Sequence, residues 1–138
     1  MKRAPLIIAA FLFVAAISGA QAATVSLVAH LLGSGMVPVT DSDAFAEAQF
    51  SYDSATHALQ YYVNYDGVAP SKVDLHGPAA ATDKAASVLD IPVSESPISG
   101  KLQLTPAEEN ELLAGKMYLD VHSQKYPAGE IRGQIVRQ

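Results

Sequence analysis

The segment KMYLDVHSQKYPAGEIRGQIV, from Lys116 to Val136, alternates apolar and polar residues on both sides of a central turn. A period of two places successive side chains on opposite faces of a β-strand, so that one face can be buried. Pro127 and Gly129 supply the turn, because proline fixes its own φ and glycine accepts a positive φ. The segment therefore predicts a β-hairpin with one apolar face.

The two faces of this hairpin carry different chemistry. Its apolar face consists of alternate residues from both arms: Met117, Leu119, Val121, Ile131, Gly133 and Ile135. Its polar face consists of the residues between them: Tyr118, Asp120, His122, Glu130, Arg132 and Gln134. We expect any chemistry of the chain to involve this polar face.

The rest of the chain alternates in the same way in short stretches between turn residues. Strands are expected in TVSLVAH, AFAEAQFSYD, HALQYYVNYDG, SKVDLHGPA, VLDIPV and KLQL. One helix is expected in TPAEENELLAG, where Thr105 caps the helix, Pro106 fits its first position and Glu108 completes a capping box. Seven or eight short strands with one short helix predict an all-β fold, an antiparallel β-sandwich or partly open barrel.

The first 22 residues have the composition of a secretory signal peptide. A basic start, an uncharged apolar run over residues 5–17 and the small residues Ala20 and Ala22 fit that class. The run is shorter than the roughly 20 apolar residues that a membrane-spanning helix needs. We therefore expect cleavage after Ala22 and a single periplasmic or secreted domain over residues 23–138, with no membrane span.

Cleavage would also change the charge of the chain. Because Lys2 and Arg3 would be lost with the signal peptide, the formal net charge would move from −5 to −7. An acidic surface disfavours nucleic acid and anionic lipid as partners. The chain has no cysteine, so the domain must be stable without disulfides, which a single core of about 116 residues allows.

Two segments, VDLHG and LDVHS, repeat one frame in which an aspartate and a histidine stand two positions apart. This spacing puts both side chains on one face of a strand. The four residues concerned are Asp74, His76, Asp120 and His122. If the two strands are neighbours, the four side chains converge and could hold a divalent metal such as Zn²⁺, Cu²⁺, Mn²⁺ or Fe²⁺.

The alternative interpretation is a polar network on the surface of the hairpin. In one register Asp120 lies opposite Arg132, and His122 faces Glu130. Each charged group would then have a cross-strand partner, worth roughly 0.2–1 kcal/mol per pair. Such pairing would occupy Asp120, one of the four possible ligands.

Other candidates are weaker. His30 and His57 are single histidines, and His30 would join a metal site only if its strand lay alongside. The chain contains no G-x-S-x-G, phosphate loop, H-E-x-x-H or EF-hand motif. No catalytic residue is therefore assigned, and a non-enzymatic role is favoured.

The tail resembles the C-terminal signature of the CHRD (chordin) domain, G-x-x-Y-x-N-x-H-T followed by P-x-G-E-I-R-G-Q. Ten residues match that pattern: Gly115, Tyr118, His122, Pro127, Gly129, Glu130, Ile131, Arg132, Gly133 and Gln134. Upstream, VDLHGPA is similar to the family's H-I-H-G-P-A, and LLGSGMVPV to its L-x-G-x-x-x-V-P. The resemblance covers about Val25 to Val136.

The resemblance implies an immunoglobulin-like all-β domain, found in chordin, a secreted antagonist of growth factors, and in many exported bacterial proteins. The chain departs from the pattern at three positions that matter here. Asp74 replaces the first histidine of H-x-H, Asp120 replaces an asparagine, and Met36 replaces the usual acidic residue before V-P. If the family's histidines bind a metal, this chain has exchanged one nitrogen ligand for a carboxylate.

Three functions remain open from the sequence. The first is an exported, non-enzymatic module that binds an unknown protein or small ligand through the polar face and adjoining loops. The second is a copper- or zinc-binding protein that uses the four residues of the repeated frame, with Glu130 or Arg132 orienting an imidazole and a dismutase-like redox activity as a further step. The third is a structural envelope or matrix protein. Convergence of the four ligand atoms within about 4–5 Å is the geometry that the second requires.

Overall fold

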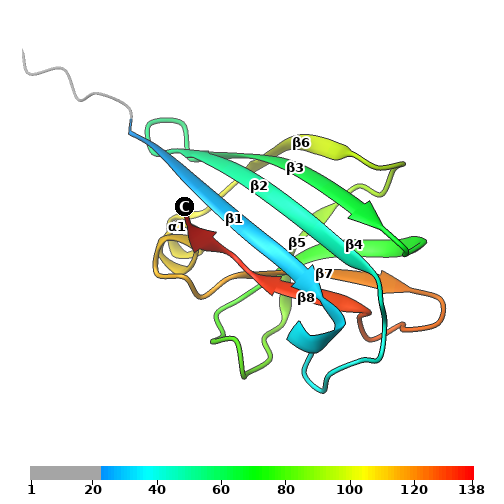
Figure 1. Ribbon diagram of the computed structural model, residues 1–138. Helices are drawn as coiled ribbons and strands as arrows, with labels where there is room; N and C mark the ends of the chain where they lie inside the picture. Colours follow the sequence, from blue (N-terminus) through cyan, green and yellow to red (C-terminus); the bar gives the residue numbers. More distant parts are fainter. Residues whose placement is uncertain (1–22) are drawn as a thin grey trace, which may run out of the picture.

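The computed structural model describes residues 23–138 (Figure 1). The expected signal peptide, residues 1–22, lies outside the described residues. Within the described chain the strands are β1 (Thr24–Leu32), β2 (Phe45–Asp53), β3 (Ala58–Asp66), β4 (Pro70–His76), β5 (Ser87–Ile91), β6 (Ile98–Gln103), β7 (Tyr118–Ser123), β8 (Ile131–Gln134) and β9 (Val136–Arg137). The helical elements are the 3₁₀ turn η1 (Gly33–Gly35) and the α-helix α1 (Pro106–Leu113).

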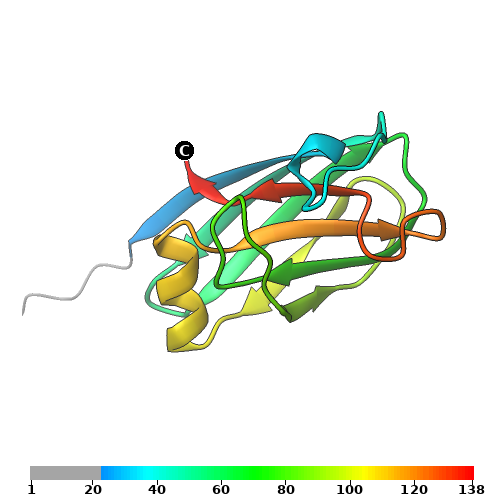
Figure 2. The same cartoon turned by 90° about the horizontal axis from the view of Figure 1, so that it is seen from below.

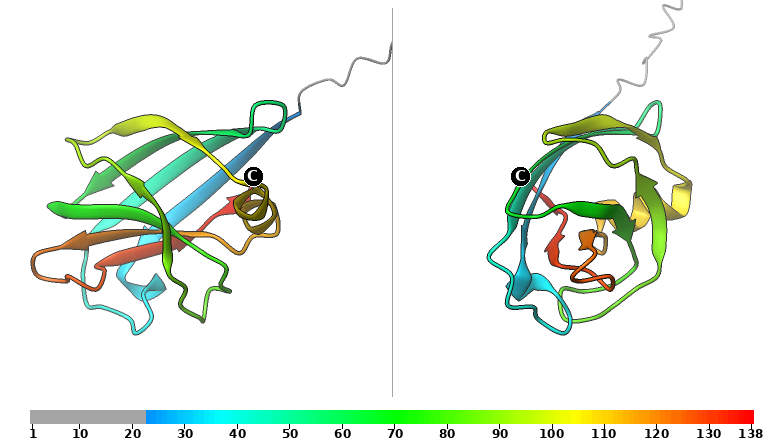
Figure 3. Two further views of the ribbon diagram at one scale, coloured as in Figure 1. Left: turned by 180° about the vertical axis from the view of Figure 1, so that it is seen from behind. Right: turned by 90° about the vertical axis from the view of Figure 1, so that its right-hand side faces the viewer.

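The strands form one antiparallel sheet in the order β5-β4-β7-β8-β1-β2-β3-β6, with β9 pairing beside β8 on β1. Viewed end-on, the sheet curls round on itself (Figure 3). Strands β5 and β6 are its two ends, so the barrel is only partly closed. The prediction of an antiparallel all-β fold with one short helix is therefore confirmed. The described residues contain nine strands, and the strand beyond the expected seven or eight is the two-residue β9.

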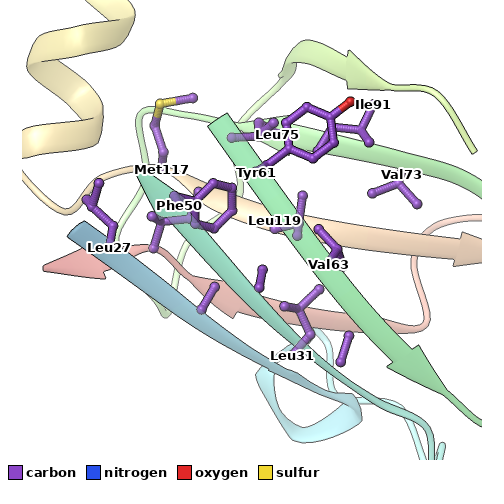
Figure 4. Close-up of a cluster of buried hydrophobic side chains, with 14 of the residues drawn as sticks. Leu27, Leu31, Phe50, Tyr61, Val63, Val73, Leu75, Ile91, Met117 and Leu119 are labelled. Carbon is purple, nitrogen blue, oxygen red and sulfur yellow. The ribbon is translucent and has the colours of Figure 1, made fainter. Parts of the chain in front are cut away.

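The hydrophobic core fills the inside of this curl, where alternate residues of every long strand meet (Figure 4). Leu31 of β1, Val63 of β3 and Leu119 of β7 are each fully buried there. Helix α1 covers one end of the curled sheet (Figure 2) and contributes the buried side chain of Leu112. No helix in the described part of the chain has the length and apolarity needed to cross a membrane.

Helix α1 begins with the predicted capping box. The Thr105 hydroxyl accepts the Glu108 N–H at 3.2 Å, and the Glu108 carboxylate accepts the Thr105 N–H at 3.2 Å. Gly115 follows the helix with a φ of 73°, the conformation that glycine adopts without steric cost. Caps of this kind stabilise a helix by about 1 kcal/mol, and the buried Leu112 side chain anchors this two-turn helix on the end of the sheet.

The closing hairpin has the expected register, with Leu119 opposite Gly133 and Asp120 opposite Arg132. Gly133 is required here because a Cβ at this position would lie 2.4 Å from the backbone oxygen of His30 on the neighbouring β1. The interpretation of the polar face as a surface network is wrong, since Asp120, Glu130 and Arg132 are all buried. The segment that follows β4 lies against this side of the ladder, where Arg132 and Gln134 donate to the Ala80 and Ala79 carbonyls.

Candidate metal centre

The two repeated frames lie on neighbouring strands. β4 pairs with β7 in antiparallel register, and this register sets Asp74 directly opposite Asp120. The residues between the polar ones, such as Leu75 and Leu119, point into the core. The alternation along both strands therefore turns the two aspartates and the two histidines to the outer side of the ladder.

The four side chains come together at one point. One ligand atom from each of Asp74, His76, Asp120 and His122 lies within 4.8 Å of the other three. The Nε2 atoms of His76 and His122 lie 3.0 and 2.8 Å from Asp74 Oδ1. The same two nitrogens lie 3.7 and 3.8 Å from Asp120 Oδ2. Asp74 and Asp120 are buried, and each imidazole is 12% exposed.

Backbone carbonyls fix the orientation of both imidazoles. The Nδ1 atom of His76 lies 2.9 Å from the carbonyl oxygen of Ala85, and the Nδ1 atom of His122 lies 3.0 Å from that of Pro127. A carbonyl oxygen only accepts, so both Nδ1 atoms carry a proton and donate it. Each ring therefore directs its Nε2 atom inward, in the arrangement that metal-binding histidines use.

This arrangement leaves the cluster short of positive charge. A neutral imidazole with its proton on Nδ1 has a lone pair on Nε2, and that lone pair would face the carboxylate oxygens. The Nε2 atom of His76 and the Oδ1 atom of Asp120 are buried without a hydrogen-bond partner among the described residues. Added positive charge relieves the conflict, either as protons on the imidazoles and on Asp120 or as one divalent cation between the four groups.

The surroundings shift the pKa values of three of these groups. Burial raises the pKa of Asp120 to about 6, an effect that the neighbouring imidazoles reduce and the Asp74 charge increases. Burial would also raise the pKa of Asp74, but His76, Ser87 and His122 outweigh it and hold that pKa well below its usual range. Burial would lower the pKa of His76, yet Asp74, the Ala85 carbonyl and Asp120 together raise it. Two facing carboxylates with opposite shifts are typical of a shared cation or proton site.

An aromatic stack supports His76 from one side. The Tyr118 ring lies parallel to the His76 ring, with centroids 4.8 Å apart. The Arg132 guanidinium lies over the Tyr118 ring, 3.5 Å from its centroid. The Tyr118 hydroxyl donates to the Ala85 carbonyl at 3.1 Å, which is the same oxygen that accepts the His76 Nδ1–H. Tyr118 thus holds both the ring of His76 and the group that sets its tautomer.

Glu130 and Arg132 do not contact the imidazoles in the way that the sequence suggested. Arg132 donates to the carbonyl oxygen of Ala80 at 3.0 Å and reaches His76 only through Tyr118. Glu130 accepts a hydrogen bond from Ser42 at 3.2 Å. Within residues 23–138 Arg132 forms no ion pair with the Asp120 that faces it, so Asp120 is not occupied by cross-strand pairing.

The other two histidines lie outside the cluster. His30 is exposed on β1, opposite Glu47 of β2. His57 stands in the β2–β3 turn with a φ of 57°, where its Nδ1 atom lies 3.0 Å from a Glu109 carboxylate oxygen. Neither histidine is among the residues that converge on the outer side of β4 and β7.

Sequence reasoning assigned neither Tyr118 nor Met36 to this site. The alternation places Tyr118 on the polar face of the hairpin, and its position two residues before Asp120 could have marked it as a neighbour of the cluster. Met36 lies in an irregular loop, where no periodicity indicates which way a side chain points. Its position beside Asp120 emerges only from the folded chain.

The fold and the site define an antiparallel all-β domain with a buried Asp₂His₂ cluster on the outer side of its sheet. The family model of the CHRD domain matches residues 27–135. The chain therefore belongs to the CHRD domain family, as the resemblance of its tail predicted. No curated protein and no solved structure matches the chain.

Proposed function

We propose that this CHRD domain binds one divalent transition-metal ion, zinc or copper, between Asp74, His76, Asp120 and His122. The observation that carries the proposal is the inward direction of two histidine Nε2 atoms onto two facing buried carboxylates. Carboxylates placed directly opposite each other in a ladder repel. A buried pair of this kind needs compensating positive charge, and a bound cation would supply it.

The spacing of the ligand atoms suits a small ion. A tetrahedral ion with bonds of about 2.0–2.1 Å holds its ligand atoms about 3.3 Å apart. The four nitrogen–oxygen separations, from 2.8 to 3.8 Å, lie on either side of that value. Two imidazole nitrogens with two carboxylate oxygens are a donor set for Zn²⁺ or Cu²⁺ rather than for Ca²⁺ or Mg²⁺, which take oxygen ligands alone.

The charges of the cluster also favour a divalent ion. A single M²⁺ ion balances the charge of the two carboxylates. Lys72 forms an ion pair with Asp74 at 3.3 Å, but its side chain is half exposed, so it offsets the Asp74 charge from the edge of the cluster. A surface cavity of about 470 Å³ has Gly129 and Pro127 in its lining, and the Pro127 carbonyl is the one that orients His122.

Metal titration of the chelator-stripped domain tests the proposal. Calorimetry with Zn²⁺ and with Cu²⁺ is expected to saturate at one equivalent per chain. At a free metal concentration about 100 times the dissociation constant, binding stabilises the fold by about 2.7 kcal/mol. For a domain of this size that corresponds to a rise in Tm of roughly 10 °C. Absence of heat and of any Tm shift with either ion would refute the proposal.

A second candidate function is an exported module that binds a partner through the loops beside the hairpin. The observation that favours it is the loop residue Val39, which is 68% exposed and lines two surface cavities of about 470 and 490 Å³. The buried polar face itself offers little surface to a macromolecule. Both proposals include export, which is the expectation from residues 1–22. A domain that takes up no metal would favour this second proposal.

A further inference from the structure

Met36 reaches the candidate metal centre from a different part of the chain. A Cβ placed on Gly129 would lie 2.5 Å from the Met36 Cε atom and 3.0 and 3.1 Å from the two carboxylate oxygens of Asp120. The methionine methyl group and the Asp120 carboxylate therefore border the same methyl-sized space above the Gly129 Cα. Met36 is buried, with 7% of its surface exposed.

The loop that carries Met36 is held in place on the hairpin. The Met36 N–H donates to the Gly33 carbonyl at 3.2 Å, and the Thr40 N–H donates to the same oxygen at 3.0 Å. The Thr40 hydroxyl donates to the Glu130 carbonyl at 2.7 Å. Figures 1 and 2 show this segment, which follows β1, beside the start of β8. Backbone hydrogen bonds on both sides of Met36 thus fix this loop on the hairpin, with the Met36 methyl group next to Gly129.

A thioether beside Asp120 has a specific chemical meaning. The Oδ1 atom of Asp120, which faces this space, is buried without a hydrogen-bond partner among the described residues. A thioether cannot donate a hydrogen bond, so Met36 cannot be the missing hydrogen-bond partner of that oxygen. Thioether sulfur is instead a soft donor that binds copper, above all copper(I), and has little affinity for zinc in competition with nitrogen and oxygen.

We infer that Met36 is a further metal-binding residue of this centre and that it makes the site selective for copper over zinc. The inference rests on the proposed metal-binding function and adds the identity of the preferred ion. His76 and His122 supply the nitrogen ligands, and Met36 approaches from the side of Asp120. The alternative role for Met36 is apolar packing over Gly129 without any contact to the metal.

The test compares Met36→Leu with Met117→Leu in the full domain. Met117 is a fully buried methionine on the core face of the hairpin, so its replacement controls for the loss of a buried thioether. Competition against a chromophoric chelator is expected to show a loss in copper affinity of at least about tenfold in Met36→Leu. The zinc affinity of that variant and both affinities of Met117→Leu should stay within about twofold of the wild type.

X-ray absorption at the copper edge provides an independent measurement. The chain has no cysteine and three methionines, so sulfur in the copper shell can come only from methionine. We expect a sulfur neighbour in the wild type and in Met117→Leu, and its loss in Met36→Leu. A wild-type shell of nitrogen and oxygen alone, with unchanged copper affinity in Met36→Leu, would overturn the Met36 assignment and leave the metal site standing. A wild type that binds neither ion would overturn both.

Discussion

Replacement of His122 by alanine is expected to lower the affinity for Zn²⁺ and Cu²⁺ by at least about 100-fold. The expectation follows from the position of its Nε2 atom, 2.8 Å from Asp74 Oδ1 and 3.8 Å from Asp120 Oδ2. No other nitrogen in the cluster can replace it, because His76 lies on the far side of the two aspartates. Removal of an outer-sphere partner alone typically costs 10–100-fold in metal affinity, so the loss of a ligand should cost more.

The matched control is His30→Ala, which removes an exposed strand histidine outside the cluster. Calorimetric titration should give wild-type affinity for His30→Ala and little or no heat for His122→Ala under the same conditions. Circular dichroism should show that both variants keep the β-sheet fold, since His122 is not part of the hydrophobic core. Equal affinities in His122→Ala and His30→Ala would show that any bound metal sits elsewhere.

Replacement of Asp120 by asparagine is expected to weaken metal binding while it stabilises the metal-free domain. Asp120 directly faces Asp74 in the ladder, and burial raises its pKa to about 6 from an ordinary 3.8. A raised carboxyl pKa means that folding favours the protonated form. The stability linked to this group is therefore complete below about pH 4 and is lost as the pH rises through about 6.

The size of this effect follows from the same pKa shift. About two pKa units correspond to about 2–3 kcal/mol, at 1.36 kcal/mol per unit. Urea denaturation of the metal-free Asp120→Asn variant at pH 8 should give a free energy of unfolding higher than that of the wild type by an amount of this order. Between pH 4 and pH 7 the stability of the variant should also vary less with pH than that of the wild type.

Asp90→Asn is the matched control for this experiment. Asp90 faces Asp74 from the other side, on β5, but its side chain is 75% exposed, so its replacement should change stability little. A substitution that lowers the metal affinity and raises the stability of the metal-free domain identifies a residue that serves binding rather than folding. A metal-free Asp120→Asn domain less stable than the wild type at pH 8 would show that the carboxylate has a structural role instead.

Local sequence signals predicted the elements that make this site. Alternation fixed the faces of the closing hairpin, and the need to keep Val121 and Ile131 on one face limited its register to steps of two residues, one of which the structure shows. The capping residues Thr105 and Glu108 placed the start of the helix. The repeated frame gave each Asp–His pair a common strand face. All of these depend on residues close together in the chain.

Local sequence signals could not predict the contacts between distant segments. The pairing of β4 with β7 joins residues more than forty positions apart in the sequence, and no local pattern specifies it. The segment between β4 and β5 looks like an ordinary polar loop, yet its Ala85 carbonyl orients His76 and it helps to bury the polar face. For the same reason the sequence placed Arg132 in an ion pair, whereas the folded chain stacks it on Tyr118.

Anomalous diffraction from crystals of the metal-loaded domain tests the central claim most directly. Data collected on either side of the zinc or copper absorption edge locate the ion without reference to any assumed site. We expect one strong peak between the outer faces of β4 and β7, with bonds of about 2.0–2.2 Å to His76, His122 and the two facing aspartates. A fully loaded crystal whose anomalous peaks all lie elsewhere, with these four side chains held by their own hydrogen bonds, would contradict it.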